Sequence, residues 1–452
     1  MDIYIRKLLK GGLVVAFVAL LTVATQAQNG LNSPYSQYGI GLNNTPYNMP
    51  AAAALGGVVY TRAANNMLNP FNPASYAVIG KETLVFDMGL NIDVTTLRNN
   101  NDKLRDGDGN LGYLAIGFPL TRWWKMALGV MPLSDVNYQS VQTVSGEPYL
   151  TNKTLYEGTG GVSQFFWGNG FNLLGGNDPS KAQLRAGFNM NLLYGTLTRA
   201  ITYQFPGNDS TYYMNERKQK DTYITNLLLE LGLQYEQPLG DKYRLGAGLT
   251  VKPHRTMNVT DNALVYTYVS HSAVEYMRDT IFPTSGDSEF ESTLEQPLSI
   301  GLGLSLQRND LWLVAVDATF APWSGLKYTE NSSYSLFGAS PLRYGNTTQL
   351  AFGVQLLGDK NATHYMRRVT YSAGFNYESG KLQLDLGGTS HRLGQWGVGC
   401  GLSLPMRKGR SVLNLSLAYS QFGDIDLLRR DVFSFGISIG SCESWFVKRK
   451  FN

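Results

Sequence analysis

The chain of 452 residues carries 38 Lys and Arg against 34 Asp and Glu. Charged residues make up only 16% of it, well below the roughly 25% usual in soluble domains. After the first two dozen residues, no window approaches the roughly 18 consecutive apolar residues that a membrane-spanning helix needs, which excludes a helical membrane protein. The chain is also rich in Gly, with 49 residues, and in aromatic residues. This composition is typical of a transmembrane β-barrel, in which only every second residue has to be apolar.

The first 27 residues have the pattern of a secretory signal peptide. Two lysines precede an apolar run over residues 13–21, and Thr25-Gln26-Ala27 supplies small residues at the spacing that signal peptidase reads. The alternative is a membrane anchor, but the apolar run is short and no Cys follows it for lipidation. We therefore predict that residues 1–27 are removed and that the mature chain begins near Gln28.

Period-two alternation of apolar and polar residues begins at Leu84. Leu84, Phe86, Met88, Leu90, Ile92 and Val94 share one face of residues 84–95, while Asp87, Asn91 and Asp93 share the other. The same pattern recurs at residues 184–194 and 413–420. The apolar face points to a core in a soluble sandwich and to lipid in an outer-membrane barrel, and a single strand does not separate the two.

Segments of this kind number fourteen. They lie at residues 82–97, 111–120, 123–145, 152–170, 181–204, 220–238, 241–262, 291–308, 310–321, 345–357, 367–378, 394–405, 411–422 and 432–440. Tight connections near residues 119–122, 239–242, 308–310 and 405–410 contrast with long ones at 98–110, 205–219, 263–290, 322–344 and 379–393. Short periplasmic turns on one rim and long external loops on the other are typical of bacterial outer-membrane barrels.

We therefore predict an all-β fold, a 14-stranded antiparallel transmembrane β-barrel over residues 81–441, with both barrel ends on the periplasmic side. Because the segments exceed the roughly 9 to 11 residues needed to cross the bilayer, some strands should project beyond it. Aromatic residues flank the tight turns at Trp123, Trp124, Tyr235, Tyr243 and Trp312, and the opposite strand ends at Tyr138, Tyr203, Trp323 and Tyr419. We interpret them as two interfacial girdles, although aromatic residues also have an ordinary preference for strands.

The stretch from Gln28 to Gly80 does not alternate and contains short motifs instead. An alanine run at residues 51–54 ends in Leu55-Gly56-Gly57, and the turn Asn69-Pro70-Phe71-Asn72-Pro73-Ala74 precedes the first strand. The barrel carries Glu-Gly-Thr-Gly-Gly-Val-Ser at residues 157–163 and a glycine-rich phrase at residues 397–405. In these motifs and their order, the chain resembles the FadL family, the fourteen-stranded long-chain fatty-acid transport proteins of Gram-negative outer membranes.

The resemblance implies an N-terminal hatch over residues 28–80 that folds into the barrel lumen and plugs it. Hydrophobic ligands would pass between hatch and wall and leave sideways through a gap. By matching motif, the hatch turn nearest the wall is formed by Asn69, Pro70, Asn72, Pro73 and Ala74. These residues either contact the ligand or only wedge the plug in place. As cations for a ligand carboxylate we name Arg62 in the hatch and Arg185 at a lumen-facing position.

The predicted function is passive uptake of a hydrophobic small-molecule ligand by an exported outer-membrane protein, surrounded by outer-membrane lipid and using no cofactor. The alternative is a non-transporting scaffold or accessory subunit of a multi-protein outer-membrane complex, for protein secretion or outer-membrane protein assembly. The basic and aromatic tail at residues 442–452 is either a docking segment for outer-membrane or periplasmic protein partners or an interfacial anchor, which we favour.

No residue pattern predicts an enzyme. Gly436-Ile437-Ser438-Ile439-Gly440 matches the nucleophile-elbow pattern, but that motif needs a strand-to-helix turn and these residues continue a strand alternation. The four histidines are scattered without the spacing of metal ligands. The formal net charge of +4 is too small to indicate a nucleic-acid partner.

An acidic stretch and two cysteines remain. Asp102, Asp106, Asp108 and Asn110 partly match a calcium loop but lack its closing Glu, so we interpret residues 98–110 as a solvated acidic loop without a metal. If Cys400 and Cys442 each lie on their own strand with another strand between, the separation of about 9.5 Å exceeds the reach of a disulfide. We therefore expect free thiols.

Overall fold

A computed structural model of the chain describes residues 33–43, 46–146, 150–176, 178, 180–205, 214–271, 274–282, 289–325, 328–329, 342–359, 361–386, 389–406 and 410–444. The predicted signal peptide and the last eight residues of the predicted tail, 445–452, lie outside the described residues. Across the described ranges, no helix is long and apolar enough to cross a membrane.

The strands form one antiparallel sheet that closes on itself. Within the described residues its wall has fourteen segments, each made of one strand or of two consecutive strands. The segments are β2 (Thr83–Arg98), β3 (Lys103–Pro119), β4 with β5 (Trp124–Asp135, Tyr138–Gly146), β6 (Leu150–Leu174), β7 (Gln183–Gln204), β8 (Asn215–Leu239), β9 with β10 (Tyr243–Lys252, Arg255–His271), β12 with β13 (Glu289–Gln296, Ser299–Arg308), β14 with β15 (Trp312–Ala321, Tyr328–Thr329), β16 with β17 (Leu342–Tyr344, Thr347–Leu356), β18 (Thr370–Leu386), β19 (Thr389–Met406), β20 (Ser411–Phe422) and β21 (Arg429–Ser444).

The ring is closed by its first and last strands, since β2 pairs with β21 along its whole length. This confirms the fourteen-stranded antiparallel barrel that the sequence predicts. The remaining strands are β1 (Leu42–Asn43), which pairs with β4, and β11 (Val274–Phe282), which pairs with β10. The short helices are η1 (Pro34–Gln37), η2 (Pro46–Asn48), α2 (Pro50–Ala53), η3 (Pro73–Val78), η4 (Trp323–Gly325) and η5 (Tyr365–Arg368).

The apolar faces of the strands point outward. On β2, Ile92 is 55% exposed, whereas Asp87 on the opposite face is fully buried. On β13, Leu302 and Leu304 are 57% and 62% exposed. An apolar outer surface around a polar interior is the arrangement of outer-membrane-type barrels, so the alternation marks a lipid-facing wall.

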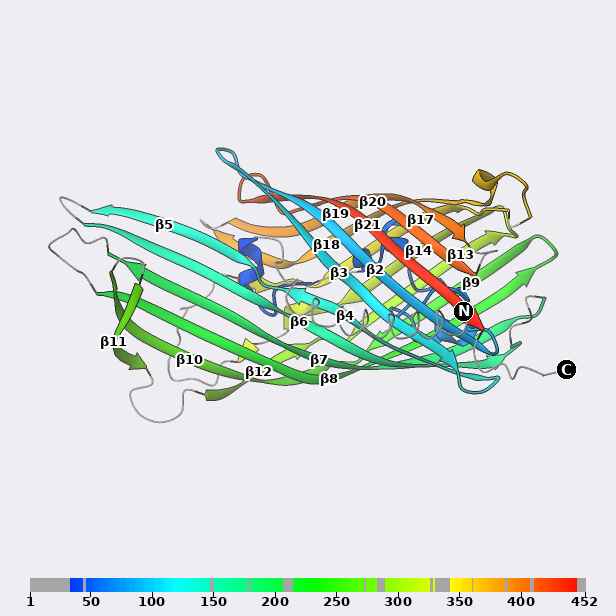
Figure 1. Ribbon diagram of the computed structural model, residues 1–452, viewed down its shortest axis with the longest axis horizontal. Helices are drawn as coiled ribbons and strands as arrows, with labels where there is room; N and C mark the ends of the chain where they lie inside the picture. The colour runs from blue at the N-terminus through cyan, green and yellow to red at the C-terminus, as the bar shows by residue number, and fades with distance from the viewer. Residues whose placement is uncertain are drawn as a thin grey trace, which may run out of the picture.

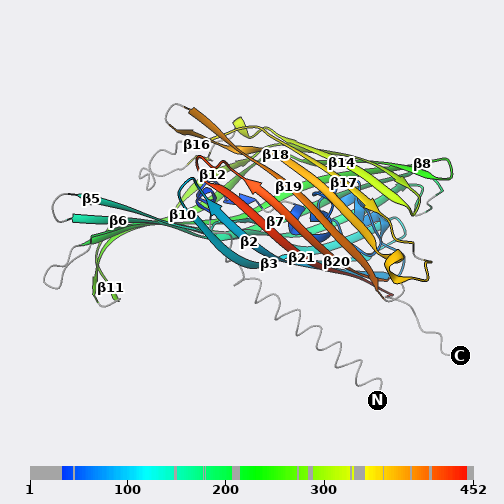
Figure 2. The same cartoon turned by 90° about the horizontal axis from the view of Figure 1, so that it is seen from above.

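Several strands project beyond the rest at one end. β6 and β8 each have 25 residues, far more than the roughly 9 to 11 that cross a bilayer. Together with β5, β10 and β11 they form an extension at the left of Figure 1, which Figure 2 shows from above. We call this the extension end. The opposite end, with the tight β3–β4, β8–β9 and β13–β14 connections, is the turn end.

Two of the predicted long loops are wrong in their bounds. β3 begins at Lys103, so residues 103–110 of the predicted loop 98–110 pair with β2. β18 and β19 likewise extend over most of residues 379–393. Acidic residues alternate with glycine at residues 106–109, so this part of β3 has no apolar face to reveal it. Among the described residues, no group of acidic, His or Cys side chains is arranged to hold a metal ion.

The two cysteines lie on separate strands. Cys400 is on β19 and Cys442 is on β21, with β20 between them, and both are free. The expectation of free thiols is confirmed. Because β21 continues to Ser444, the first three residues of the predicted tail belong to the barrel wall.

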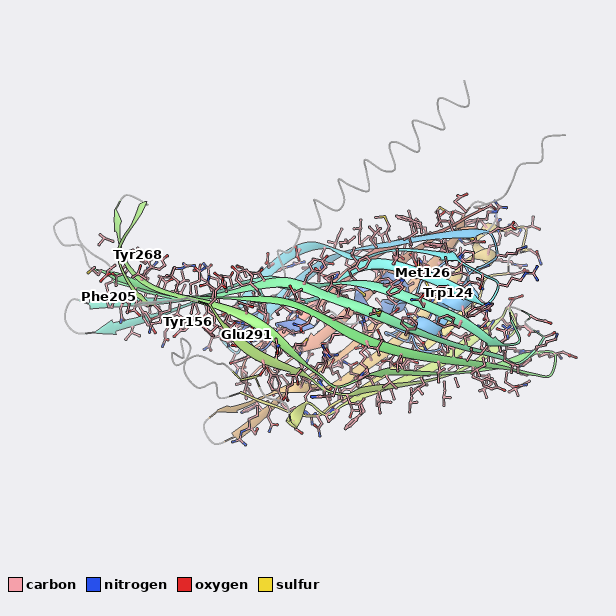
Figure 3. The ribbon with its side chains drawn as sticks, turned by 90° about the horizontal axis from the view of Figure 1, so that it is seen from below. Trp124, Met126, Tyr156, Phe205, Tyr268 and Glu291 are labelled. Atoms are coloured by element: carbon pink, nitrogen blue, oxygen red, sulfur yellow. The ribbon has the colours of Figure 1, made fainter. Side chains whose placement is uncertain are left out.

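Aromatic side chains gather at both ends of the wall. At the turn end the rings of Trp123 and Trp124 stack with Phe171, at centroid distances of 5.8 and 6.2 Å. Towards the other end, Tyr419 contacts Trp396 edge-on at a centroid distance of 5.6 Å. Figure 3 shows Trp124 at the end opposite to Tyr156, Phe205 and Tyr268, which lie on the extension. The aromatic residues thus occupy two separate levels of the barrel.

Candidate functional site in the barrel interior

The N-terminal segment, defined here as residues 33–80, contacts strands all around the ring. η3 packs against β6, β7 and β8, and α2 packs against β19, β20 and β21. Figure 1 shows the segment, in blue, among the strands of the barrel. Wall glycines permit these contacts, because a Cβ at Gly187, Gly374 or Gly399 would overlap the backbone of the segment. The glycine excess of the sequence therefore serves close approach between the segment and the wall.

The local sequence explains the path of the segment. Pro50 opens α2, where a missing N–H costs nothing, and three alanines continue the helix. Gly56 and Gly57 then adopt φ angles of 65° and 86°, a left-handed conformation that favours glycine and ends the helix after one turn. The backbone of Phe375 on β18 lies directly against Gly56, so a side chain here has no space.

Two wall carboxylates hold the backbone of the segment. Asp317 on β14 accepts hydrogen bonds from the N–H groups of Val59 and Tyr60, at 2.6 and 2.8 Å. Asp87 on β2 accepts one from the Leu68 N–H at 2.9 Å. Sequence reasoning did not select these two residues. The sequence marks them only as acidic residues at inward-facing strand positions. Many other polar residues of the wall occupy such positions as well.

The motif residues Asn69 and Asn72 cross-link the segment internally and to the wall. The Asn69 side-chain amide donates to the carbonyl oxygens of Val59 and Arg62, at 2.6 and 3.0 Å. The Asn72 amide donates to the carbonyl oxygens of Tyr60, at 2.7 Å, and of a β8 wall residue, at 3.2 Å. Both side-chain oxygens also accept hydrogen bonds from backbone N–H groups two residues along the chain.

Pro70, Pro73 and Ala74 complete the same contact. The Pro70 carbonyl accepts a hydrogen bond of 2.7 Å from the Asn189 side chain on β7. Pro73 lies against two wall glycines of β7 and β8, and Ala74 is fully buried. The five motif residues therefore come together at one place on the wall, and the side-chain polar groups of Asn69 and Asn72 are engaged within the chain.

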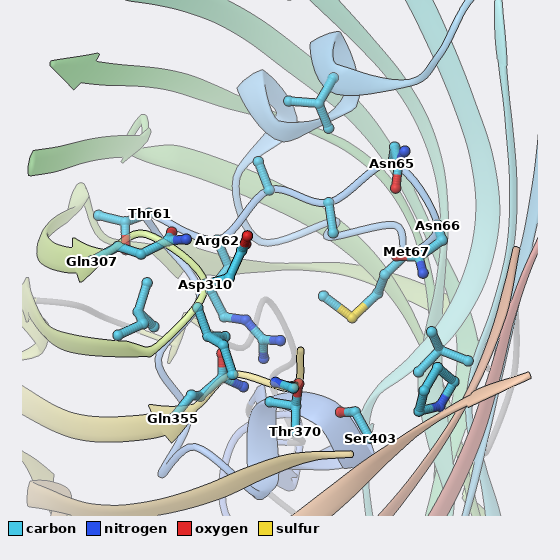
Figure 4. A pocket seen from close by; sticks show the side chains of 18 of the residues that line it. Thr61, Arg62, Asn65, Asn66, Met67, Gln307, Asp310, Gln355, Thr370 and Ser403 are labelled. Carbon is cyan, nitrogen blue, oxygen red and sulfur yellow. Dashed lines mark hydrogen bonds between the residues drawn. The ribbon is translucent and has the colours of Figure 1, made fainter. Parts of the chain in front are cut away.

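A cavity of about 1240 Å³ lies at the turn end, between the N-terminal segment and the wall. Arg62 and Arg185, the two cations named from the sequence, both line it, whereas the five motif residues do not. Figure 4 shows Arg62 among polar side chains of the segment and of the strands around it. Arg244 of β9 and Arg368 of η5 also line the cavity. Sequence reasoning missed these two because only the pairing of the strands brings them close.

The charges in the cavity are unevenly paired. Arg185 and Arg244 share one carboxylate, that of Glu236, at 2.8 and 3.7 Å. Arg62 donates to the carbonyl oxygen of Ala51 at 2.7 Å and forms no ion pair with a described residue. Burial lowers the pKa of Arg62 to about 10, an effect that more distant carboxylates oppose. Its guanidinium is therefore protonated at neutral pH.

The wall is interrupted between β3 and β4, and we call this interruption the β3–β4 breach. The two strands pair only over residues 114–119 of β3 and 125–130 of β4. Beyond these residues β3 continues to pair with β2, and β4 and β5 continue to pair with β6, but β3 and β4 no longer pair with each other. The N-terminal segment contacts both edges of the breach. On one edge β1 pairs with the end of β4 and the Ser33 N–H donates to the Asn137 carbonyl at 2.8 Å, and on the other the Asn48 carbonyl lies against Gly112 of β3.

An apolar cluster lies on the inner face of the wall near the breach. Ile40 of the N-terminal segment packs against it. Its buried members are Val136, Tyr138, Val162, Leu193, Leu197, Ile224, Met257 and Val259. Here the interior is apolar, in contrast to the charged cavity at the turn end.

Solved structures share this fold at low sequence identity. The CymD monoaromatic hydrocarbon channel is 15% identical, with 90% of this chain and 100% of that chain covered and a TM-score of 0.53. A Pseudomonas aeruginosa FadL homologue is 14% identical, with coverage of 90% and 100% and a TM-score of 0.54. The Pseudomonas putida toluene transporter TodX is 16% identical, with coverage of 89% and 99% and a TM-score of 0.50. No curated protein matches the sequence.

A closed fourteen-stranded barrel with an apolar outer face defines the class of outer-membrane-type β-barrels, and the resemblance to the FadL family holds for the fold. The model of one protein family, described as BamG, matches residues 5–452. The chain therefore belongs to the BamG family.

Proposed function

We propose that this chain is an outer-membrane barrel of FadL type that lets hydrophobic small molecules pass passively into the membrane plane through the β3–β4 breach. The observation that supports this proposal is the breach, together with the apolar cluster beside it on the inner face of the wall. In this proposal residues 28–80 are the hatch, and the motif residues Asn69 to Ala74 wedge the hatch against β7 and β8. The turn end faces the periplasm.

The chemistry of the interior supports an apolar cargo on this route. A small aromatic hydrocarbon gains roughly 25 cal/mol for each Å² of apolar surface removed from water, and the cluster offers a surface of that kind. Two of the proteins that share this fold, a monoaromatic hydrocarbon channel and a toluene transporter, are named for cargo of this kind. Toluene is therefore the first compound to test.

The experiment measures uptake of labelled toluene by cells that express the chain. Ile40→Asp places a charge in the apolar cluster without changing a wall strand, and we expect uptake to fall about tenfold, equivalent to about 1.4 kcal/mol. Ile281→Asp is the matched control, because Ile281 is exposed on β11 of the extension. Uptake by the unaltered protein no faster than by cells lacking it would reject the transport proposal.

A second candidate is an accessory subunit of a multi-protein outer-membrane complex. It is favoured by the charged cavity at the turn end, which an apolar cargo leaving through the breach does not use. Gentle solubilisation followed by native mass spectrometry tests it. A stable complex with other outer-membrane or periplasmic proteins supports this candidate, and a monomer alone, together with toluene uptake, rejects it.

A further inference from the structure

The cavity at the turn end has a positive bias. Four arginines line it, against the carboxylates of Glu236 and Asp310. Glu236 is already shared between two of these arginines, Arg185 and Arg244. Arg62 and Arg368 form no ion pair among the described residues, and Asp87 and Asp317, which act on Arg62 from farther away, do not line the cavity. The lining itself therefore has an excess of positive charge, which attracts anions.

The polar groups of the cavity wall are not all satisfied within the chain. Arg185 is 3% exposed, yet its Nε has no hydrogen-bond partner among the described residues. Arg62 has one carbonyl partner for its guanidinium, which carries five donor N–H groups. A buried donor without a partner keeps the cost of its lost hydration, so a ligand that supplies acceptors here relieves an existing penalty.

Neutral amides surround these cations. Figure 4 shows Asn65, Asn66, Gln307 and Gln355 around the same space as Arg62. An amide side chain both donates and accepts hydrogen bonds, which matches the alternating groups of a polypeptide backbone. The volume of about 1240 Å³ also exceeds the 300–1,000 Å³ usual for small-molecule pockets. Size and chemistry together fit an extended chain segment rather than a compact metabolite.

We propose that this cavity binds an acidic polypeptide segment of a partner protein on the turn side of the barrel, with a carboxylate of the segment on Arg62 and its backbone on the surrounding amides. Arginine is suited to this because its planar fork holds a carboxylate with two parallel hydrogen bonds. The site is separate from the β3–β4 breach and does not rest on the transport proposal.

The test uses the full chain in lipid nanodiscs and a fluorescent six-residue peptide in which Glu alternates with Gly. We expect the peptide to bind, and its counterpart with Gln in place of Glu to bind at least tenfold more weakly. Affinity should fall with added salt, because charge attraction is screened. Absence of binding by the acidic peptide, or equal binding of the two peptides, overturns the proposal.

Substitutions of cavity residues test whether the peptide binds in the cavity. Arg62→Gln should weaken binding of the acidic peptide at least tenfold, and Arg62→Lys should restore part of the lost affinity. Arg122→Gln is the matched control, since Arg122 is exposed on the β3–β4 turn outside the cavity. Arg368→Gln, on η5 at the cavity, is a second variant that leaves the N-terminal segment intact and should also weaken binding. Unchanged binding in both cavity variants overturns the proposal.

Inorganic phosphate is an anion, as the acidic peptide is. Competition between the two therefore tests whether the cavity recognises a polypeptide or a small anion. If phosphate displaces the peptide only at concentrations at which chloride does so, the site recognises the polypeptide, as proposed. If phosphate alone binds more tightly than the peptide, the cavity is a site for a small anion, and the polypeptide proposal is wrong.

Discussion

At the residue scale, the interior of the barrel is organised by paired charges. Lys220 lies 3.3 Å from Asp261, and Lys252 lies 3.3 Å from Glu230, all within the polar interior. A buried charge is costly unless it is paired or hydrogen-bonded. Asp317 meets this requirement in a different way, because backbone N–H groups of the N-terminal segment are its partners. The segment is therefore tied to the wall by directed polar contacts as well as by packing.

Replacing Asp317 tests this tie. Asp317→Ala leaves the N–H groups of Val59 and Tyr60 without their acceptor, and we expect the free energy of unfolding to fall by about 2–3 kcal/mol. Urea unfolding in lipid vesicles, followed by tryptophan fluorescence, measures the change. Asp241→Ala, at an exposed position in the β8–β9 turn, is the control. Equal stability of the two variants would show that the contact carries no net free energy.

The candidate site was only partly predictable at this scale. Arg62 and Arg185 could be chosen from the sequence as candidate site residues, because few cations lie in the predicted hatch or at inward-facing strand positions. Their meeting in one cavity with Arg368 was not, since these residues are far apart in the chain and only the register of the wall brings them together. The pairing of Arg185 with Glu236 depends in the same way on the alignment of β7 with β8.

At the element scale, strands could be predicted where their two faces differ in hydrophobicity. They were missed where the two faces are alike. β2 alternates apolar and polar residues, and its bounds match the predicted segment within one residue. In the outer half of β3, residues 103–110, Leu104 is the only large apolar residue, so the hydrophobic pattern does not distinguish this part from a loop. Pairing with β2 makes it a strand, because backbone hydrogen bonds require no particular side chain.

Glycine on the inner face of a strand also has a testable role. Gly187→Ala places a Cβ against the Pro73 backbone, and we expect it to destabilise the barrel by about 1–3 kcal/mol through overpacking. Gly107→Ala on β3 should cost much less, because the nearest atom to its added Cβ lies 4.0 Å away. The same urea titration compares the two. If the Gly187 variant is as stable as the Gly107 variant, the N-terminal segment moves away from the added Cβ without a cost in free energy.

At the scale of the whole molecule, the outward apolar faces define which part of the barrel lies in lipid. Leu304 is in the middle of β13, and Val141 is on β5 in the extension, and both are more than half exposed. We expect Leu304→Arg to cost about 2–4 kcal/mol, as a cation does near the bilayer midplane. Val141→Arg should cost less than about 1 kcal/mol, because we expect the extension to lie outside the bilayer.

The measurement is again unfolding from lipid vesicles, with both arginine variants compared with the unaltered chain. Similar large losses for the two would contradict the assignment of β5 to an extension in water. Similar small losses would instead place β13 outside the lipid and reject the orientation of the apolar surface.

The pairing of β2 with β21 has a consequence for the order of assembly. The last wall strand of the chain, 16 residues long, has to be present before the ring is complete. The N-terminal segment is made first, yet its contacts reach strands from β2 to β21. The buried contacts of the segment with strands from both ends of the chain require those strands to lie around it. We therefore expect the barrel to be assembled around the segment, so that the earliest residues act as the template on which the final strand completes the enclosure.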